Sequence, residues 1–396
     1  MSKKRIAFVL GTRPDIIRAS LILKYLKSYE EIETKFIWSG QHYSDNLKGI
    51  FLRELEVDAP AIELGGKGDT DAEIVSSIIA KLYKVLEKIK PDVVVFLGDT
   101  NTVISCIAAA QLNIPIVHIE GGMRSYDWRM PEEKYRTVSD HLADLIYVYS
   151  DEYKEQAIRE GINPNNIEVV GNPIVDIINK FYFEKKEEFN KMATDNFFKE
   201  RGITKNNYYV LTWHRRENVH EKESFNAIIN LLSNSPFKVY FPASYRTKKV
   251  IKEAGVSLPE NIIMDDPIGY NELLTLMVNS RGILTDSGTI VEEASILQVP
   301  CVQMRRSTER PQVYDVGGCV KFDPTTPLRY PAETVFKKLE SLFGKKWKHN
   351  LGDGKTSERI AKDLKSRVLE NRINGHKKEQ YNIPIERSYR EDEIKL

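Results

Sequence analysis

The chain has 396 residues, of which 41% are hydrophobic, so it is long enough for about two or three domains with buried cores. Lysine and arginine number 58 and aspartate and glutamate 57, which gives a net charge of +1 at pH 7. This balance argues against a general nucleic-acid-binding surface, although it is compatible with a local cationic cleft.

The cysteines and the apolar runs indicate the compartment. Cys106, Cys301 and Cys319 are far apart and odd in number, which fits a reducing cytoplasm and gives neither a zinc nor a disulfide pattern. The apolar run 6–10 is too short for a signal-peptide core, and no stretch approaches the ~20 apolar residues of a membrane span. We therefore expect a cytoplasmic protein with no membrane segment.

Apolar strands alternate with helices in the first half of the chain. Residues 6–10 form an apolar run typical of a strand covered on both faces, and a helix with apolar positions Ile17, Leu21 and Tyr25 follows. The same pattern recurs, with strands predicted at 34–39, 92–97, 115–119 and 145–149 and helices at 72–90, up to 112, and 131–142. This alternation predicts a doubly wound parallel sheet, in which ligands bind at the carboxyl ends of the strands. Arg13, Asp99 and Glu120 follow three different strands at that edge.

A second α/β series begins at residue 208. Residues 181–207 are rich in Lys, Glu and Asn, which predicts a charged helix and a hinge. Strands are then expected at 208–213, 237–241, 262–264, 282–285 and 300–304. The predicted domains are 1–178, 179–365 and a charged tail, 366–396, that either crosses back to the first domain or extends freely.

Residues 281–293 predict a strand end, a Ser-Gly turn and the first turn of a helix. Asp286, Ser287 and Gly288 occupy the expected N-cap, where unpaired N–H groups and the helix dipole favour a phosphate. Glu292 and Glu293 follow about 100° apart around the helix axis, so at most one faces such a ligand. The alternative is an ordinary capped helix with a solvated Glu pair.

Three carboxylates could share the cleft of the first domain. Asp99, Glu120 and Glu132 would meet there, and carboxylates that share a site separate their pKa values, so that one can donate a proton while another accepts one. The alternatives are that Asp99 caps a helix and that Glu132 is an ordinary charge at a helix N-terminus.

Cationic side chains follow strands in both halves of the chain. The segment 214–218, which contains His214 and Arg215, could bind a diphosphate and assist its departure. Arg13 and Arg18 flank the first helix start and are as compatible with structural pairing as with phosphate binding. The loop that contains Arg310 is expected to be solvated by default.

Taken together, these stretches resemble the UDP-N-acetylglucosamine 2-epimerase family. The ordered set of segments is specific, although each is weak alone: Gly11–Asp15, Gly40–His42, Gly98–Thr100, His118–Arg124, Pro131–Glu133, His214–Asn218, Asp286–Gly288 with Glu292 and Glu293, and Thr308–Pro311. The resemblance implies two Rossmann-like domains that face each other as in the GT-B glycosyltransferases, with the nucleotide on the C-terminal domain.

The resemblance also implies roles for individual residues. Asp99, Glu120 and Glu132 match the family's acid/base carboxylates, with His214 near the leaving diphosphate. The substrate-binding set is Arg13, Arg18, Gln41, Arg215, Ser287, Gly288, Thr289, Glu293 and Arg310. The implied reaction is anti elimination of UDP from a UDP-N-acetylhexosamine to a glycal, followed by readdition with C2 protonated from the other face. It needs neither NAD nor a metal, and the family implies a homodimer that feeds surface polysaccharide synthesis.

Departures from the family pattern leave the sugar open. Arg18 stands where the family usually has Lys, Gly65–Asp69 replaces a Gln-rich stretch linked to activation by substrate, and Thr289 replaces a glycine. The alternatives are a hydrolysing 2-epimerase that releases UDP and the free sugar, a GT-B glycosyltransferase, and a non-catalytic nucleotide-sugar sensor.

Overall fold

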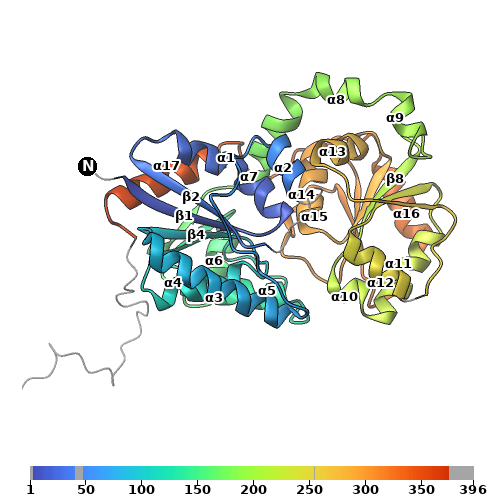
Figure 1. Ribbon diagram of the computed structural model, residues 1–396. Helices are drawn as coiled ribbons and strands as arrows, with labels where there is room; N and C mark the ends of the chain where they lie inside the picture. Colours follow the sequence, from blue (N-terminus) through green and yellow to red (C-terminus); the bar gives the residue numbers. More distant parts are fainter. Residues whose placement is uncertain (1–2, 41–47, 254, 374–396) are drawn as a thin grey trace, which may run out of the picture.

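The computed structural model describes residues 3–40, 48–253 and 255–373 (Figure 1). Within these residues the chain forms two α/β domains, each built on a parallel sheet flanked by helices. The predicted fold class, two Rossmann-like doubly wound domains in a GT-B arrangement, is confirmed.

The first domain contains a seven-stranded sheet in the order β3-β2-β1-β4-β5-β6-β7 among the described residues. Its strands are β1 (Lys4–Leu10), β2 (Ile32–Trp38), β3 (Ile62–Glu63), β4 (Val93–Leu97), β5 (Ile116–Ile119), β6 (Leu145–Val148) and β7 (Ile167–Val169). Its helices include α1 (Arg13–Ser28), α2 (Gly49–Glu54), α3 (Asp71–Ile89), α4 (Cys106–Gln111), α5 (Pro131–Leu142), α6 (Asp151–Arg159) and α7 (Pro173–Ile178).

The second domain contains a six-stranded sheet in the order β10-β9-β8-β11-β12-β13 among the described residues. Its strands are β8 (Tyr208–Thr212), β9 (Lys238–Pro242), β10 (Ile262–Asp265), β11 (Gly282–Thr285), β12 (Cys301–Met304) and β13 (Cys319–Phe322). Its helices are α10 (Arg216–Val219), α11 (Lys222–Ser233), α12 (Tyr245–Glu253), α13 (Tyr270–Val278), α14 (Gly288–Leu297), α15 (Gln312–Asp315) and α16 (Ala332–Leu342).

In both sheets the order in which strands are added reverses next to a central strand. In the first sheet the chain runs outward from β1 to β3 and then restarts at β4 on the other side of β1, and β8 and β11 have the same relation in the second sheet. The carboxyl ends of two such strands open a crevice, which is where open α/β sheets bind ligands. Arg13 and Asp99 lie at the first of these switch points, and His214 and Ser287 at the second.

The apolar runs of the central strands are explained by burial on both faces. Along β8, Tyr208 and Val210 belong to one core cluster, whereas Tyr209 and Leu211 belong to another, and all four side chains are fully buried. A strand with helices on both sides needs apolar residues at every position, because successive side chains point to opposite faces.

The connection between the domains differs from the predicted charged helix. It consists of the π-helical turn η4 (Asn179–Phe183) and two short helices, α8 (Lys186–Met192) and α9 (Asp195–Lys199). Phe181, Phe189 and Phe198 are buried, so this segment contributes to the core between the domains. Three aromatic residues at irregular spacing give no helical stripe, and for this reason the periodicity did not show their burial.

After the second domain the chain returns to the first. Helix α17 (Thr356–Leu369) packs against α1 and α7, as Figure 1 shows, and Tyr147 on β6 donates a hydrogen bond of 2.8 Å to Asp363. The rest of the predicted tail, from residue 374, lies outside the described residues. None of the described helices is long and apolar enough to cross a membrane.

Polar contacts join the domains around the two crevices. Glu54 on α2 accepts hydrogen bonds from the backbone N–H of Tyr270 (2.6 Å) and Asn271 (3.1 Å) at the N-terminus of α13. Elsewhere on the boundary between the domains, Arg129 of the first domain pairs with Glu221 of the second at 2.8 Å. These contacts hold the carboxyl edges of the two sheets against each other.

Candidate active site

Asp99 and Glu120 lie at the ends of adjacent strands of the first sheet. β4 and β5 pair directly, and each chain turns sharply after its strand, with φ of 85° at Gly98 and 77° at Glu120. A left-handed conformation at a non-glycine residue costs about 1–3 kcal/mol and persists only where surrounding contacts hold it. Glu120 is therefore placed by its environment and not by local preference.

Arg136 binds both of these carboxylates. Its Nη2 contacts Asp99 Oδ2 and lies 3.2 Å from Glu120 Oε1, and its side chain is 1% exposed. Glu120 also pairs with Arg18 and accepts a hydrogen bond of 3.1 Å from Tyr149. The two carboxylates are thus fixed relative to each other by their shared partner Arg136.

On the second sheet, Asp286 joins the ends of β8 and β11. Its carboxylate accepts hydrogen bonds from the backbone N–H of His214 (3.1 Å) and Arg215 (2.8 Å) and from the Asn218 amide (3.2 Å). Ser287 is the N-cap of α14 and makes no side-chain cap bond, so Asp286 serves the 214–218 segment and does not cap the helix as predicted. The free N–H groups at the start of α14 consequently lie beside His214 and Arg215.

Gly288 is required because Arg310 packs directly on it. A Cβ placed on Gly288 would lie 2.3 Å from Arg310 Nη1 and 2.9 Å from Glu309 Oε1. The Arg310 guanidinium extends from there to Glu292 (2.9 Å) and, across the domain boundary, to Glu120 (3.1 Å). One arginine therefore connects the N-terminus of α14 to the carboxylates of the first domain.

The loop that carries Arg310 is buried at Arg305, Glu309 and Arg310, so the predicted solvated loop is wrong for these three charges, whereas Arg306 is exposed. Arg305 and Arg310 are each 3% exposed and Glu309 is 1% exposed, and Arg305 pairs with Glu309 at 2.8 Å. Burial alone would raise the pKa of Glu309, but Arg305, Arg310 and Arg215 hold it well below its usual range. Glu309 pairs with Arg305 and Arg310 within the loop itself, and Arg310 also reaches Glu120 of the first domain.

Arg215 and Glu132 meet across the boundary between the domains. Arg215 Nη1 lies 3.5 Å from Glu132 Oε1, at the first turn of α5. Burial raises the pKa of Glu132, partly opposed by Arg215. Burial would also raise the pKa of Asp99, but the charges of Arg136 and Arg215 outweigh it, so that pKa is lowered. The two carboxyls thus tend toward opposite protonation states, which is the arrangement of an acid and a base.

The remaining predicted cations differ in exposure. The His214 side chain is 47% exposed, and its pKa is lowered by desolvation, which Asp286 opposes only in part. Arg13 lies 5.5 Å from the centre of the Phe51 ring, and burial lowers its pKa to about 10. Arg18 is 3% exposed. Gln41 falls outside the described residues.

Glu292 and Glu293 are both buried, which excludes the solvated pair. Glu292 bonds Arg310 and Asn172, whereas Glu293 accepts a hydrogen bond of 2.8 Å from the Tyr270 hydroxyl. The two carboxylates therefore point to different partners, as their angular separation predicts. Burial raises the pKa of Glu293 to about 8. Thr289, the residue that follows Gly288 in α14, is 8% exposed.

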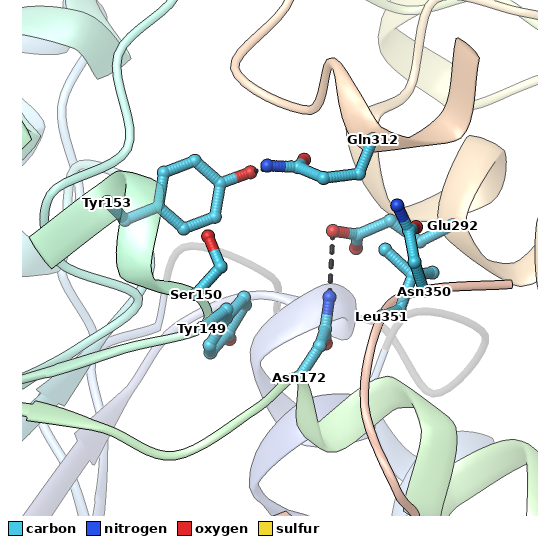
Figure 2. Close-up of a pocket in the computed structure, with 8 residues that line it drawn as sticks. All are labelled: Tyr149, Ser150, Tyr153, Asn172, Glu292, Gln312, Asn350 and Leu351. Atoms are coloured by element: carbon cyan, nitrogen blue, oxygen red, sulfur yellow. Dashed lines mark hydrogen bonds between the residues drawn. The ribbon is translucent and has the colours of Figure 1, made fainter. Parts of the chain in front are cut away.

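A small cavity lies behind these residues. Figure 2 shows Tyr149, Tyr153 and Asn172 of the first domain facing Glu292 and Gln312 of the second. Its volume of about 20 Å³ is near that of a single water site and far below that of a sugar. Across the described residues, no group of three or more His, Cys, Asp or Glu side chains is arranged to hold a metal ion.

A family model for UDP-N-acetylglucosamine 2-epimerase matches residues 24–365, a range that contains Asp99, His214, Ser287 and Arg310. The chain belongs to this family. A UDP-N-acetylglucosamine 2-epimerase of Methanocaldococcus jannaschii is 37% identical over 377 residues, which cover 91% of this chain and 98% of that protein. A UDP-2,3-diacetamido-2,3-dideoxy-D-glucuronate 2-epimerase of Pseudomonas aeruginosa is 28% identical over 91% of this chain and 99% of that protein.

Solved structures of the family share this fold. The crystal structure of the Methanocaldococcus jannaschii UDP-GlcNAc 2-epimerase in complex with UDP-GlcNAc and UDP has a TM-score of 0.81 and 36% identity, over 91% of this chain and 99% of that one. The Neisseria meningitidis UDP-GlcNAc 2-epimerase bound to UDP-GlcNAc has a TM-score of 0.76 and 27% identity, over 91% and 100%.

Sequence reasoning missed Arg136 and Tyr149. Arg136 stands four residues after Glu132 on α5, and positions four apart share a helix face, so the spacing could have identified it. Tyr149 follows β6 at the same sheet edge as Glu120. It could have been identified because ligands bind at the carboxyl ends of the strands in such sheets.

Proposed function

We propose that the protein epimerises a UDP-2-acetamido sugar at C2, by anti elimination of UDP to a glycal and readdition of UDP. The observation that carries the proposal is the contact of Arg215, beside the N-terminus of α14, with Glu132 of the other domain. This contact brings the cations that would bind the leaving diphosphate next to the carboxylates that would transfer the C2 proton. The elimination requires both groups.

Arg215, His214 and the start of α14 would bind the diphosphate. The proton at C2 has no adjacent carbonyl and is only weakly acidic, so cleavage of the C1–O bond must run ahead of proton removal. Fixed cations and helix N–H groups near the leaving diphosphate stabilise the charge that develops on it.

Asp99 and Glu132 would transfer the protons. Their side chains are 13% and 28% exposed, whereas Glu120 is 1% exposed and surrounded by arginines. We assign Asp99, whose pKa is lowered, as the base that removes the C2 proton, and Glu132, whose pKa is raised, as the acid on the other face. Glu120 would orient Arg18 and Arg136 around the hexose.

UDP-GlcNAc is the first substrate to test, because it is the one in the name of the relative that is 37% identical. The P. aeruginosa relative, which is named for a diacetamido glucuronate, supports a panel of related UDP sugars. We further propose a cytoplasmic homodimer that supplies surface polysaccharide synthesis. Reduced cysteines fit that compartment.

Proton NMR of the UDP-sugar panel in D₂O tests this function. Deuterium at C2 with the UDP sugar intact is the expected result. Accumulation of UDP and free sugar would establish a hydrolysing 2-epimerase, the second candidate, which Gly65–Asp69 in place of the family's Gln-rich stretch favours. Absence of exchange unless an acceptor is added would indicate a glycosyltransferase, and binding without any turnover a sensor.

A further inference from the structure

His118 is fully buried on β5, two residues before Glu120, and the reaction scheme above does not use it. Its Nδ1 lies 2.7 Å from Asp140 Oδ1, and its Nε2 lies 2.8 Å from the backbone carbonyl of Gly98. Both partners are within hydrogen-bonding distance, so each ring nitrogen has a defined role.

Both of these partners accept. A carbonyl oxygen has no proton to give, and Asp140 is ionised, because Arg124 and His118 outweigh its burial and lower its pKa to about 2. Asp140 also accepts from the Gly122 N–H at 3.0 Å and lies 2.8 Å from Arg124 Nη2. The His118 ring therefore lies between two acceptors, one at each ring nitrogen.

The two bonds of His118 fix the turns on which Asp99 and Glu120 lie. Gly98 immediately precedes Asp99, and Gly122 lies two residues after Glu120. Both glycines have left-handed φ values, 85° and 73°, as has Glu120 itself. A chain that leaves its strand in this conformation relies on such external bonds to keep its direction.

Close packing at this point leaves little room for adjustment. A Cβ on Gly121 would lie 2.7 Å from Asp140 Oδ1, and one on Gly122 would lie 2.3 Å from the Tyr153 carbonyl oxygen. A shift of the Asp140 carboxylate would therefore be transmitted to the peptide that carries Glu120.

We propose that His118 is a positioning residue for proton transfer at C2: by contacting one partner with each ring nitrogen, it joins the peptide before Asp99 to the Asp140-bound turn after Glu120, and so sets the spacing of the two carboxylates. This inference rests on the proposed function. It assigns His118 no contact with the substrate and no part in UDP binding, which the second domain provides.

Two substitutions each preserve one of the bonds. His118→Asn places an amide nitrogen where Nδ1 lies and keeps the bond to Asp140, whereas His118→Gln places one where Nε2 lies and keeps the bond to Gly98. Neither side chain can contact both partners at once. We expect each to lower kcat for C2 deuterium exchange by about 10²-fold, the cost of a misplacement near 1 Å, while the Kd for UDP stays unchanged.

Tyr147→Phe is the matched control. It removes a different buried hydrogen bond, to Asp363, from the neighbouring strand β6, and leaves the backbone carbonyl of Tyr147 in place to accept from Glu120 and Gly121. We expect Tyr147→Phe to lower Tm with no loss of kcat. A loss of kcat in Tyr147→Phe equal to that in the His118 variants, or a parallel loss of UDP affinity in the latter, would reduce His118 to a structural residue and overturn the proposal.

If the wild-type protein exchanges the C2 proton and both His118 variants are as active as the wild type, the positioning role alone is refuted. Wild-type protein that never exchanges C2 would instead refute the proposed function.

Discussion

Gly288→Ala tests whether Arg310 connects the two domains through the start of α14. The backbone φ at Gly288 is not in the left-handed region, so alanine is compatible with the local conformation and the obstacle is the Arg310 guanidinium, 2.3 Å from the new Cβ. Arg310 would have to withdraw, which breaks its pairs with Glu292 (2.9 Å) and Glu120 (3.1 Å).

The expected magnitude follows from two opposing effects. Removing one partner of a buried ion pair costs about 3–5 kcal/mol, because the other charge is left without compensation. Alanine in a helix is better than glycine by about 1 kcal/mol, which offsets part of that cost. We therefore expect the free energy of unfolding to fall by about 2–4 kcal/mol, and UDP to bind more weakly because the same turn would hold the diphosphate.

Urea unfolding of the four proteins of a double-mutant cycle measures the effect. On an Arg310→Leu background the closer obstacle is absent and only the Glu309 Oε1 contact at 2.9 Å remains, so Gly288→Ala should there cost much less. Equal losses from Gly288→Ala on both backgrounds would show that Arg310 is not the cause. A Gly288→Ala protein as stable as wild type, with unchanged UDP affinity by calorimetry, would refute the packing described here.

Three further predictions concern single side chains. Asp99→Asn should abolish C2 exchange measured by NMR in D₂O while UDP binding survives in calorimetry; undiminished exchange would remove Asp99 as the base. Arg18→Lys should change the ranking of UDP sugars by kcat/KM, since a lysine cannot reproduce the planar guanidinium that reaches both Glu120 and Asp15, and an unchanged ranking would make Arg18 a structural residue. Glu293→Gln should change the pH dependence of stability. The Glu293 pKa is raised from 4.5 to about 8, so its contribution is complete below pH 4.5 and is lost as the pH rises through about 8, by up to about 5 kcal/mol. Glutamine cannot ionise, so urea unfolding at about pH 6 and about pH 9 should show a smaller loss for the variant than for wild type, and equal losses would contradict the buried state of Glu293.

The order of helices and strands follows from local pattern. The double burial of strands such as β8 requires apolar residues at every position, and the residue that follows each such strand must lie at one edge of the sheet. Asp99, Glu120 and His214 were therefore assignable to the edges of two sheets from their places in the chain.

The sequence alone thus determined two doubly wound sheets and the family. What only the tertiary structure decided was how the two edges meet. Arg310 pairs with Glu120, 190 residues away, and the Tyr153 hydroxyl donates to the carbonyl of Glu309, 156 residues away. No periodicity encodes such contacts, because they depend on how whole domains pack. For the same reason the burial of Arg305, Glu309 and Arg310 and the two contacts of His118 became visible only in three dimensions.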